Sequence, residues 1–128
     1  MKKLIVIWLV LMLLTACGQG GADVPEQGYV NITAQQAKEI MDNEEGYIIL
    51  DVRTAEEYAE KHIPGAVLIP DDEIKQKAEE ILTDKSQLIL VYCRSGRRSK
   101  LAAEDLVELG YTNIKEFGGI IDWPYEVE

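Results

Sequence analysis

Leu88-Ile-Leu-Val-Tyr92 is the strongest strand candidate in the chain, and it leads directly into Cys93-Arg-Ser-Gly-Arg-Arg98. Ser99–Leu109 then has the spacing of an amphipathic helix. The strand lacks polar alternation, which is typical of parallel strands that are covered on both faces. Because ligands of open α/β sheets bind at the carboxyl ends of the strands, residues 93–98 are the expected binding loop. This stretch predicts an α/β fold with its site at that loop.

The rest of the chain repeats this alternation of strand and helix on both sides of the central stretch. Four further strands are expected, at Tyr29–Ile32, Tyr47–Asp51, Ala66–Ile69 and Asn113–Glu116. Helices are expected after the capping boxes that begin at Thr33 and Thr54, and over Asp71–Leu82. Gly118-Gly119 is expected to interrupt the chain before a short closing segment. The pattern predicts a three-layer sandwich, in which a mostly parallel central sheet of about five strands is flanked by helices.

Several features of residues 93–98 favour an anion at Cys93. The helix that follows offers unpaired backbone N–H groups and a partial positive charge. Gly96 allows a tight turn that points further N–H groups inward, and Arg94, Arg97 and Arg98 add three fixed positive charges. We therefore expect Cys93 to react as a thiolate and the loop to bind an oxyanion. The alternative is an inert, buried cysteine beside solvated arginines.

The N-terminal residues are typical of a bacterial export signal. Lys2 and Lys3 precede eleven unbroken apolar residues, Leu4–Leu14, and this run is too short to cross a bilayer, which needs about 20. Leu14-Thr-Ala-Cys17 resembles the lipobox of bacterial lipoproteins, in which the cysteine is lipidated and becomes the mature N-terminus. The resemblance implies an extracytoplasmic protein that is anchored to a bacterial membrane only through the lipid on Cys17. The alternative is an ordinary secretory cleavage site.

This interpretation divides the chain into three parts and narrows the function classes. We expect a signal peptide at residues 1–16, a flexible tether at residues 17–28 and a folded domain at residues 29–128.

Removal of the signal peptide would change the net charge from −10 to −12, so binding to nucleic acid is not expected. With Cys17 lipidated, Cys93 is the one remaining thiol, which excludes a disulfide scaffold and a Cys-x-x-Cys redox pair. One cysteine and one histidine cannot form a familiar zinc site, and no metal or other cofactor is expected.

The sequence resembles the single-domain members of the rhodanese family over about residues 30–124. The resemblance rests on four motifs in the expected order: Asp51-Val-Arg53 with Glu56-Glu-Tyr58, His62-Ile-Pro-Gly-Ala66, Cys93-Arg-Ser-Gly-Arg-Arg-Ser99, and Leu109-Gly-Tyr111 with Phe117-Gly-Gly119 and Trp123. Each motif is weak alone, whereas their joint order and spacing are specific. One departure is Lys61, which stands where many members of the family carry glycine.

The resemblance implies a sulfurtransferase. In that family the loop cysteine takes a sulfane sulfur from a small anionic donor such as thiosulfate, forms a persulfide, and passes the sulfur to a thiol or to cyanide. Cys93 is then the catalytic residue, and the anion is held by Arg94, Ser95, Gly96, Arg97 and Arg98. Structural support near the site comes from Asp51, Arg53, Glu57 and His62. Because the mature chain has no second thiol, an external acceptor has to remove the sulfur.

Two other functions stay open. A phosphatase or arsenate reductase of the same broad fold has five residues between the cysteine and the anion-binding arginine, and here that position is Ser99. A rhodanese-like module could also act without turnover, as a stoichiometric sulfur carrier or as a partner-binding domain. The intact cysteine argues against a module that only binds, but it does not separate a carrier from a catalyst.

Overall fold

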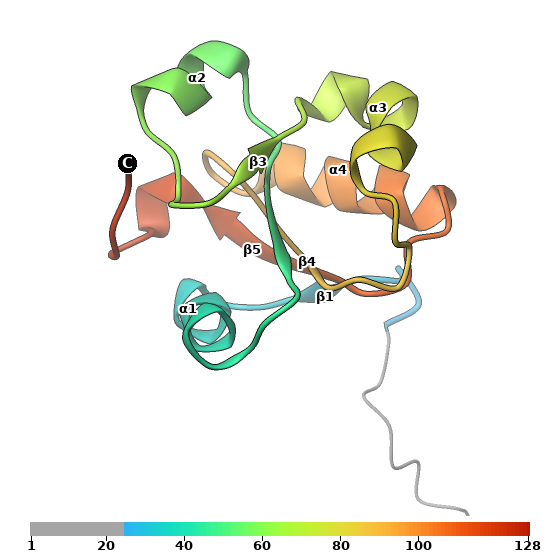
Figure 1. Cartoon of the computed structure of the whole chain (residues 1–128), viewed down its shortest axis with the longest axis horizontal. Coiled ribbons are helices and arrows are strands. Elements are labelled where there is room, and N and C mark those ends of the chain that lie inside the picture. Colours follow the sequence, from blue (N-terminus) through green and yellow to red (C-terminus); the bar gives the residue numbers. More distant parts are fainter. Residues whose placement is uncertain (1–24) are drawn as a thin grey trace, which may run out of the picture.

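Within residues 25–128, which the computed structural model describes, five strands form one sheet through the middle of the molecule (Figure 1). The strands are β1 (Val30–Asn31), β2 (Ile48–Asp51), β3 (Val67–Leu68), β4 (Ile89–Cys93) and β5 (Ile114–Gly119). Their order in the sheet is β1-β5-β4-β2-β3, and each neighbouring pair is parallel. The predicted α/β fold with a parallel central sheet is confirmed, and the strand that carries Cys93 lies at the centre of that sheet.

Helices cover both faces of the sheet. They are α1 (Ala34–Asn43), α2 (Ala55–Glu60), α3 (Ile74–Ile81) and α4 (Arg97–Glu108), with 3₁₀ turns at Asp71–Glu73 and Ile120–Asp122. α1 lies on one face, and α3 and α4 pack together on the other (Figure 1). Thr33 and Thr54 each form the predicted capping box, in which the threonine hydroxyl accepts a hydrogen bond from the backbone three residues later.

The sheet separates two apolar cores. The core on the α3 and α4 face contains Val91 and Cys93, whereas the core on the α1 face contains Leu90 and Tyr92. Successive residues of β4 alternate between the two because side chains of a strand point to opposite faces. All five residues of β4 are buried, which is the two-sided coverage that the apolar sequence of this strand predicts.

The start of α4 differs from the sequence prediction. The helix begins at Arg97 rather than at Ser99. Gly96 stands at its N-cap in the left-handed conformation, with φ of 105°. Because glycine adopts this conformation without strain, the loop turns within one residue and the helix begins at once. Arg97, Arg98 and Ser99 therefore form the first turn of the helix.

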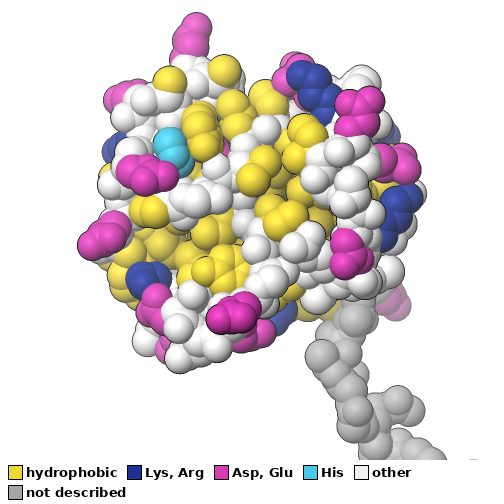
Figure 2. Space-filling model, viewed as in Figure 1, with side chains coloured by type: hydrophobic (Ala, Val, Ile, Leu, Met, Phe, Trp, Pro, Cys, Tyr) yellow, Lys and Arg dark blue, Asp and Glu magenta, His cyan; other side chains and the backbone are white. Residues whose placement is uncertain are grey.

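The N-terminal features predicted from the sequence lie outside the described residues. These are the signal peptide over residues 1–16, the lipidation site Cys17 and most of the tether over 17–28. Between residues 25 and 128, no helix combines the length and the apolar character needed to cross a membrane. Acidic side chains are spread around the rim of the face shown in Figure 2, with apolar side chains between them.

Candidate active site

Cys93 is the last residue of β4, and its side chain is buried beneath the start of α4. Only 1% of the residue is exposed. The backbone N–H of Gly96 donates to its Sγ over 3.0 Å. The next N–H groups of the chain belong to the first turn of α4, where they have no partner within the helix. The sulfur therefore lies where backbone dipoles suit a negative charge.

β5 passes directly beneath this loop at Gly118 and Gly119. A Cβ atom on Gly119 would lie 1.9 Å from the carbonyl oxygen of Arg94, so only glycine fits there. The pairing register between β4 and β5 shifts by one residue just before Cys93 pairs with Gly119. The sequence predicts an interruption at these glycines, and that prediction is wrong. The strand continues through them, because a bulge absorbs the extra residue and the missing side chains allow the close approach.

The three loop arginines have different surroundings. Arg94 and Arg97 are exposed, as is Ser95 at the tip of the loop. Arg98 instead forms a two-pronged ion pair with Glu57 of α2, with Nη1–Oε1 and Nη2–Oε2 distances of 2.7 and 2.9 Å. This bond raises the pKa of Arg98 and lowers the pKa of Glu57 to about 2. A predicted anion ligand and a predicted support residue are thus joined to each other, and they tie α2 to α4.

Asp51 and Arg53, which the sequence predicts as supports, form a buried ion pair at the end of β2. Arg53 Nη2 lies 2.6 Å from Asp51 Oδ2 and also donates to the carbonyl oxygen of Lys61. The hydroxyl of Tyr92 donates to the same carboxylate and accepts from the backbone N–H of Ile63. Burial, together with the bond to Asp51, raises the pKa of Tyr92. The network fastens the 61–66 turn to the sheet, and Tyr92 is a member that the sequence motifs did not single out.

His62 has both ring nitrogens engaged by neighbouring segments. Its Nδ1 lies 2.8 Å from the carbonyl oxygen of Tyr58, and the two rings stack with centroids 3.8 Å apart. Its Nε2 lies 3.2 Å from a carboxylate oxygen of Glu128. These contacts hold the turn that begins at His62 against α2 and the C-terminal segment.

Two buried polar residues, Ser99 beside Cys93 and Glu116 beyond it, were not predicted as site residues from the sequence. The hydroxyl oxygen of Ser99 lies 3.3 Å from Sγ of Cys93 and 2.8 Å from Oε1 of Glu116. Both residues are buried, with exposed fractions of 0% and 2%. The alternation of β5 is the signal that could have revealed Glu116, because this residue shares the face of Ile114, which is turned toward α4.

A cleft of about 380 Å³ opens between α2 and the loop. Its walls carry both signs of charge and two apolar side chains, and are formed by Arg53, Glu57, Glu60, Lys61, Arg94, Ile120 and Ile121. Arg94 lines this cleft and directly follows Cys93 in the chain, so the cleft lies beside the loop that carries the thiol. Across residues 25–128, no cluster of His, Cys, Asp or Glu could hold a metal ion.

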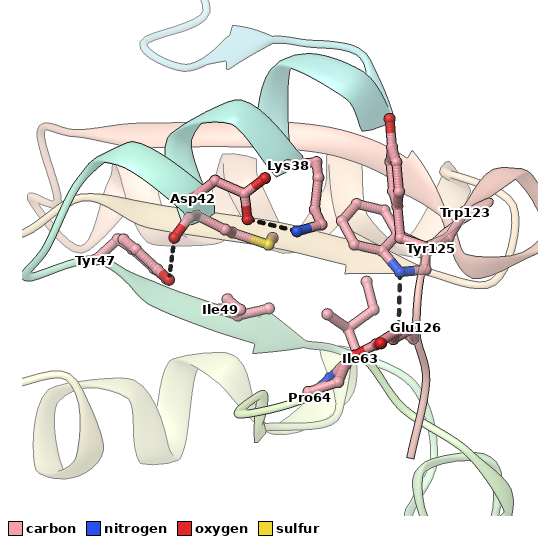
Figure 3. Close-up of a pocket in the computed structure, with 10 residues that line it drawn as sticks. Lys38, Asp42, Tyr47, Ile49, Ile63, Pro64, Trp123, Tyr125 and Glu126 are labelled. Atoms are coloured by element: carbon pink, nitrogen blue, oxygen red, sulfur yellow. Dashed lines mark hydrogen bonds and ion pairs between the residues drawn. The ribbon is translucent and has the colours of Figure 1, made fainter.

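A second hollow, of about 410 Å³, lies against α1 (Figure 3). Ile49, Ile63 and Trp123 give it an apolar floor, and the ion pair between Lys38 and Asp42 lies along one side (Figure 3). None of the predicted site residues lines it. Three of the predicted site residues, Arg53, Glu57 and Arg94, line the cleft beside the loop instead.

Relatives of the chain carry sulfur-transfer names. It is 41% identical to thiosulfate sulfurtransferase PspE of Escherichia coli over 73 residues, which cover 57% of this chain and 70% of that protein. It is 35% identical to the putative sulfur carrier protein YrkF of Bacillus subtilis over 111 residues, which cover 86% of this chain and 56% of that protein. The chain thus spans little more than half of this second relative.

Solved structures and a model of a protein family indicate which family the chain and these relatives share. A rhodanese with anions from E. coli matches with a TM-score of 0.60 and 36% identity, over 64% of this chain and 96% of that one. A rhodanese-related protein from Thermoplasma volcanium matches with a TM-score of 0.68 and 30% identity, over 78% of this chain and 98% of that one. The model of the rhodanese-like domain matches residues 33–124. The chain therefore belongs to the family of rhodanese-like domains.

Proposed function

We propose that this protein is a sulfurtransferase that takes a sulfane sulfur from thiosulfate or a similar anion and carries it on Cys93. The observation that supports this most is the position of Sγ, 3.0 Å from the backbone nitrogen of Gly96 and at the N-terminus of α4. A persulfide places its negative charge on the terminal sulfur. Backbone N–H groups and exposed guanidinium groups can stabilise that charge where it forms.

The proposed reaction begins with attack of the Cys93 thiolate on the sulfane sulfur of thiosulfate. A sulfur–sulfur bond forms to Cys93 while the bond to the sulfonate sulfur breaks, and sulfite leaves with that electron pair. Arg94 lines the cleft and is placed to hold the donor anion. The products are sulfite and a Cys93 persulfide, so the total charge is unchanged and no oxidant is needed.

The second half of the reaction needs an external acceptor. Cys93 is the one cysteine between residues 25 and 128, so no neighbouring thiol in this domain resolves the persulfide. A thiolate or cyanide attacks the terminal sulfur, and Cys93 leaves as the thiolate. Steady-state formation of thiocyanate from thiosulfate and cyanide tests this cycle. We expect many turnovers per protein and none in Cys93→Ser; turnover of an aryl phosphate without thiocyanate would contradict the proposal.

A sulfur carrier is the second candidate, because one relative is named a putative sulfur carrier protein. A carrier accepts one sulfur and waits for a particular partner. The same assay separates the two functions. One burst of thiocyanate, equal to the amount of protein and followed by no further product, would favour the carrier.

We also propose that the domain is lipid-anchored and extracytoplasmic, through Cys17. The support is the order of Lys2 and Lys3, the apolar run and the Leu14-Thr-Ala-Cys17 motif in the sequence. Fractionation of cells that produce the full chain tests this. The native protein should sediment with membranes and Cys17→Ala should not; a Cys17→Ala variant that stays in the membrane fraction would contradict the lipid anchor.

A further inference from the structure

Glu116 is an acidic residue in the apolar core under the loop of residues 93–98. It is 2% exposed, and its Oε1 accepts hydrogen bonds from the backbone N–H of Gly118 and from the hydroxyl of Ser99, each over 2.8 Å. Among residues 25–128, no Lys or Arg forms an ion pair with it. A buried charge without a cation is costly. Through the hydroxyl of Ser99, this carboxyl group lies one hydrogen-bonded step from the thiol of Cys93.

Ser99 connects the thiol to this carboxyl group. Its Oγ lies 3.3 Å from Sγ of Cys93 on one side and 2.8 Å from Oε1 of Glu116 on the other. A hydroxyl donates one hydrogen and accepts others. When Ser99 donates to Glu116, rather than to the carbonyl oxygens of Gly96 or Gly118 that it also approaches, it can accept a hydrogen bond from the thiol. When it donates to a thiolate, it can accept a hydrogen bond from a protonated carboxyl group.

Charged groups lie around both ends of the hydrogen-bonded path from Cys93 to Glu116. Those beside Cys93 are mostly cationic and belong to Arg94, Arg97 and Arg98, with Glu57 and Asp71 beyond Arg98. Beside Glu116 lies the hydroxyl of Tyr29, whose pKa is raised by burial and by the charges of Glu104 and Glu116. Two adjacent anions repel each other. A single negative charge shared by the pair avoids this repulsion.

We propose that Glu116 is a positioning residue that stores, through Ser99, the proton that Cys93 releases on becoming the nucleophile. The proton of the thiol moves to Oγ of Ser99 while the hydroxyl proton moves to Oε1 of Glu116. The electron pair of the S–H bond stays on sulfur, and the pair keeps one negative charge throughout. The role deepens the proposed sulfur transfer and rests on it, because the stored proton keeps Cys93 a thiolate before attack and after the acceptor removes the sulfur.

Alkylation of Cys93 by iodoacetamide as a function of pH tests this in the full chain, with the Cys93-containing peptide followed by mass. Two coupled groups give two inflections in such a profile. We expect two inflections in the native protein and one in Glu116→Gln and in Ser99→Ala. Glu104→Gln removes the same charge from the exposed side of α4 and should keep both inflections. A single inflection in the native protein, or two in Glu116→Gln, would overturn the proposal.

A measurement on the native protein does not depend on the folding of these variants. Near neutral pH, its infrared spectrum should contain the band of a protonated carboxyl group, and this band should disappear as the pH rises through the second inflection. A spectrum without such a band near neutral pH would overturn the proposal. Sulfur loading from thiosulfate is recorded separately. Two inflections in a protein that takes no sulfur would support the proton store and contradict the proposed function.

Discussion

The sulfur of Cys93 meets hydrogen-bonding groups from two segments that the chain brings together at the end of β4. Gly96 donates from the loop and Ser99 lies beside the sulfur in the first turn of α4. The exposed arginines of the loop differ from these two groups, because their side chains face solvent. In the proposed reaction, the buried groups act on the sulfur and the exposed arginines act on the incoming anion.

Arg94→Gln should lower kcat/KM for thiosulfate by roughly tenfold or more, since a hydrogen bond to a charged group contributes about 1.5–3 kcal/mol. Arg94 is exposed and lines the cleft. Lys100→Gln is the matched control, because Lys100 is an exposed cation of α4 outside the cleft lining. Initial rates at several thiosulfate concentrations measure the effect. Equal losses in both variants would show that net charge alone matters.

The pair of Arg98 and Glu57 should make stability depend on pH in the acidic range. The bond from Arg98 lowers the pKa of Glu57 from 4.5 to about 2, so the stabilisation is complete above 4.5. The stabilisation is lost as the pH falls from 4.5 to about 2, because the carboxylate of Glu57 then binds a proton. Denaturant midpoints of the native protein and Glu57→Gln should therefore converge on acidification.

Glu56→Gln is the control for this comparison. Glu56 lies in the same first turn of α2 and is exposed. The denaturant midpoint of Glu56→Gln should differ from that of the native protein by a nearly constant amount over the same pH range. A gap between the native protein and Glu57→Gln that does not change with pH would contradict a role for the ion pair in stability.

At the scale of elements, β5 limits the shape of the loop of residues 93–98. The loop backbone at Arg94 lies so close to Gly119 that a single added carbon would overlap its carbonyl oxygen. The register shift between β4 and β5 occurs at the same place. Strand and loop therefore fit each other as backbone against backbone, with little contribution from side chains.

Gly119→Ala should displace the loop and remove sulfur loading, while destabilising the fold by about 1–3 kcal/mol through overpacking. Chemical denaturation and the mass of the protein after incubation with thiosulfate measure the two effects. Gly46→Ala is the control, because a Cβ there meets no atom within 4 Å although φ is 77°. This control should lose some stability and keep sulfur loading. Full loading in Gly119→Ala would contradict the proposed constraint.

The sequence predicts most elements because their signals are local. Apolar strands and threonine capping boxes depend on neighbours within a few residues, and they are found where expected. The ion pair of Arg98 with Glu57 and the contact of Ser99 with Glu116 join residues far apart in the chain. Such contacts depend on how the helices pack over the sheet. The bulge at Gly118-Gly119 was missed for the same reason, since it compensates a mismatch between two strands.

At the scale of the whole molecule, the parallel sheet gathers the site from distant segments. β2, β4 and β5 all end at the same edge, so the ion pair of Asp51 and Arg53, the loop after Cys93, and the glycines of β5 meet there. The full sequence has a net charge of −10. We expect the cationic groups at this edge to favour small anions at the loop, against the repulsion of the acidic chain as a whole.

The central claim is that this edge stabilises a negatively charged sulfur on Cys93, and the mass of the Cys93-containing peptide tests it most directly. After incubation with thiosulfate and removal of the excess, this peptide should be heavier by one sulfur atom. Treatment with cyanide should return it to its original mass. A peptide whose mass does not change, or a sulfur atom found on another residue, would contradict the account.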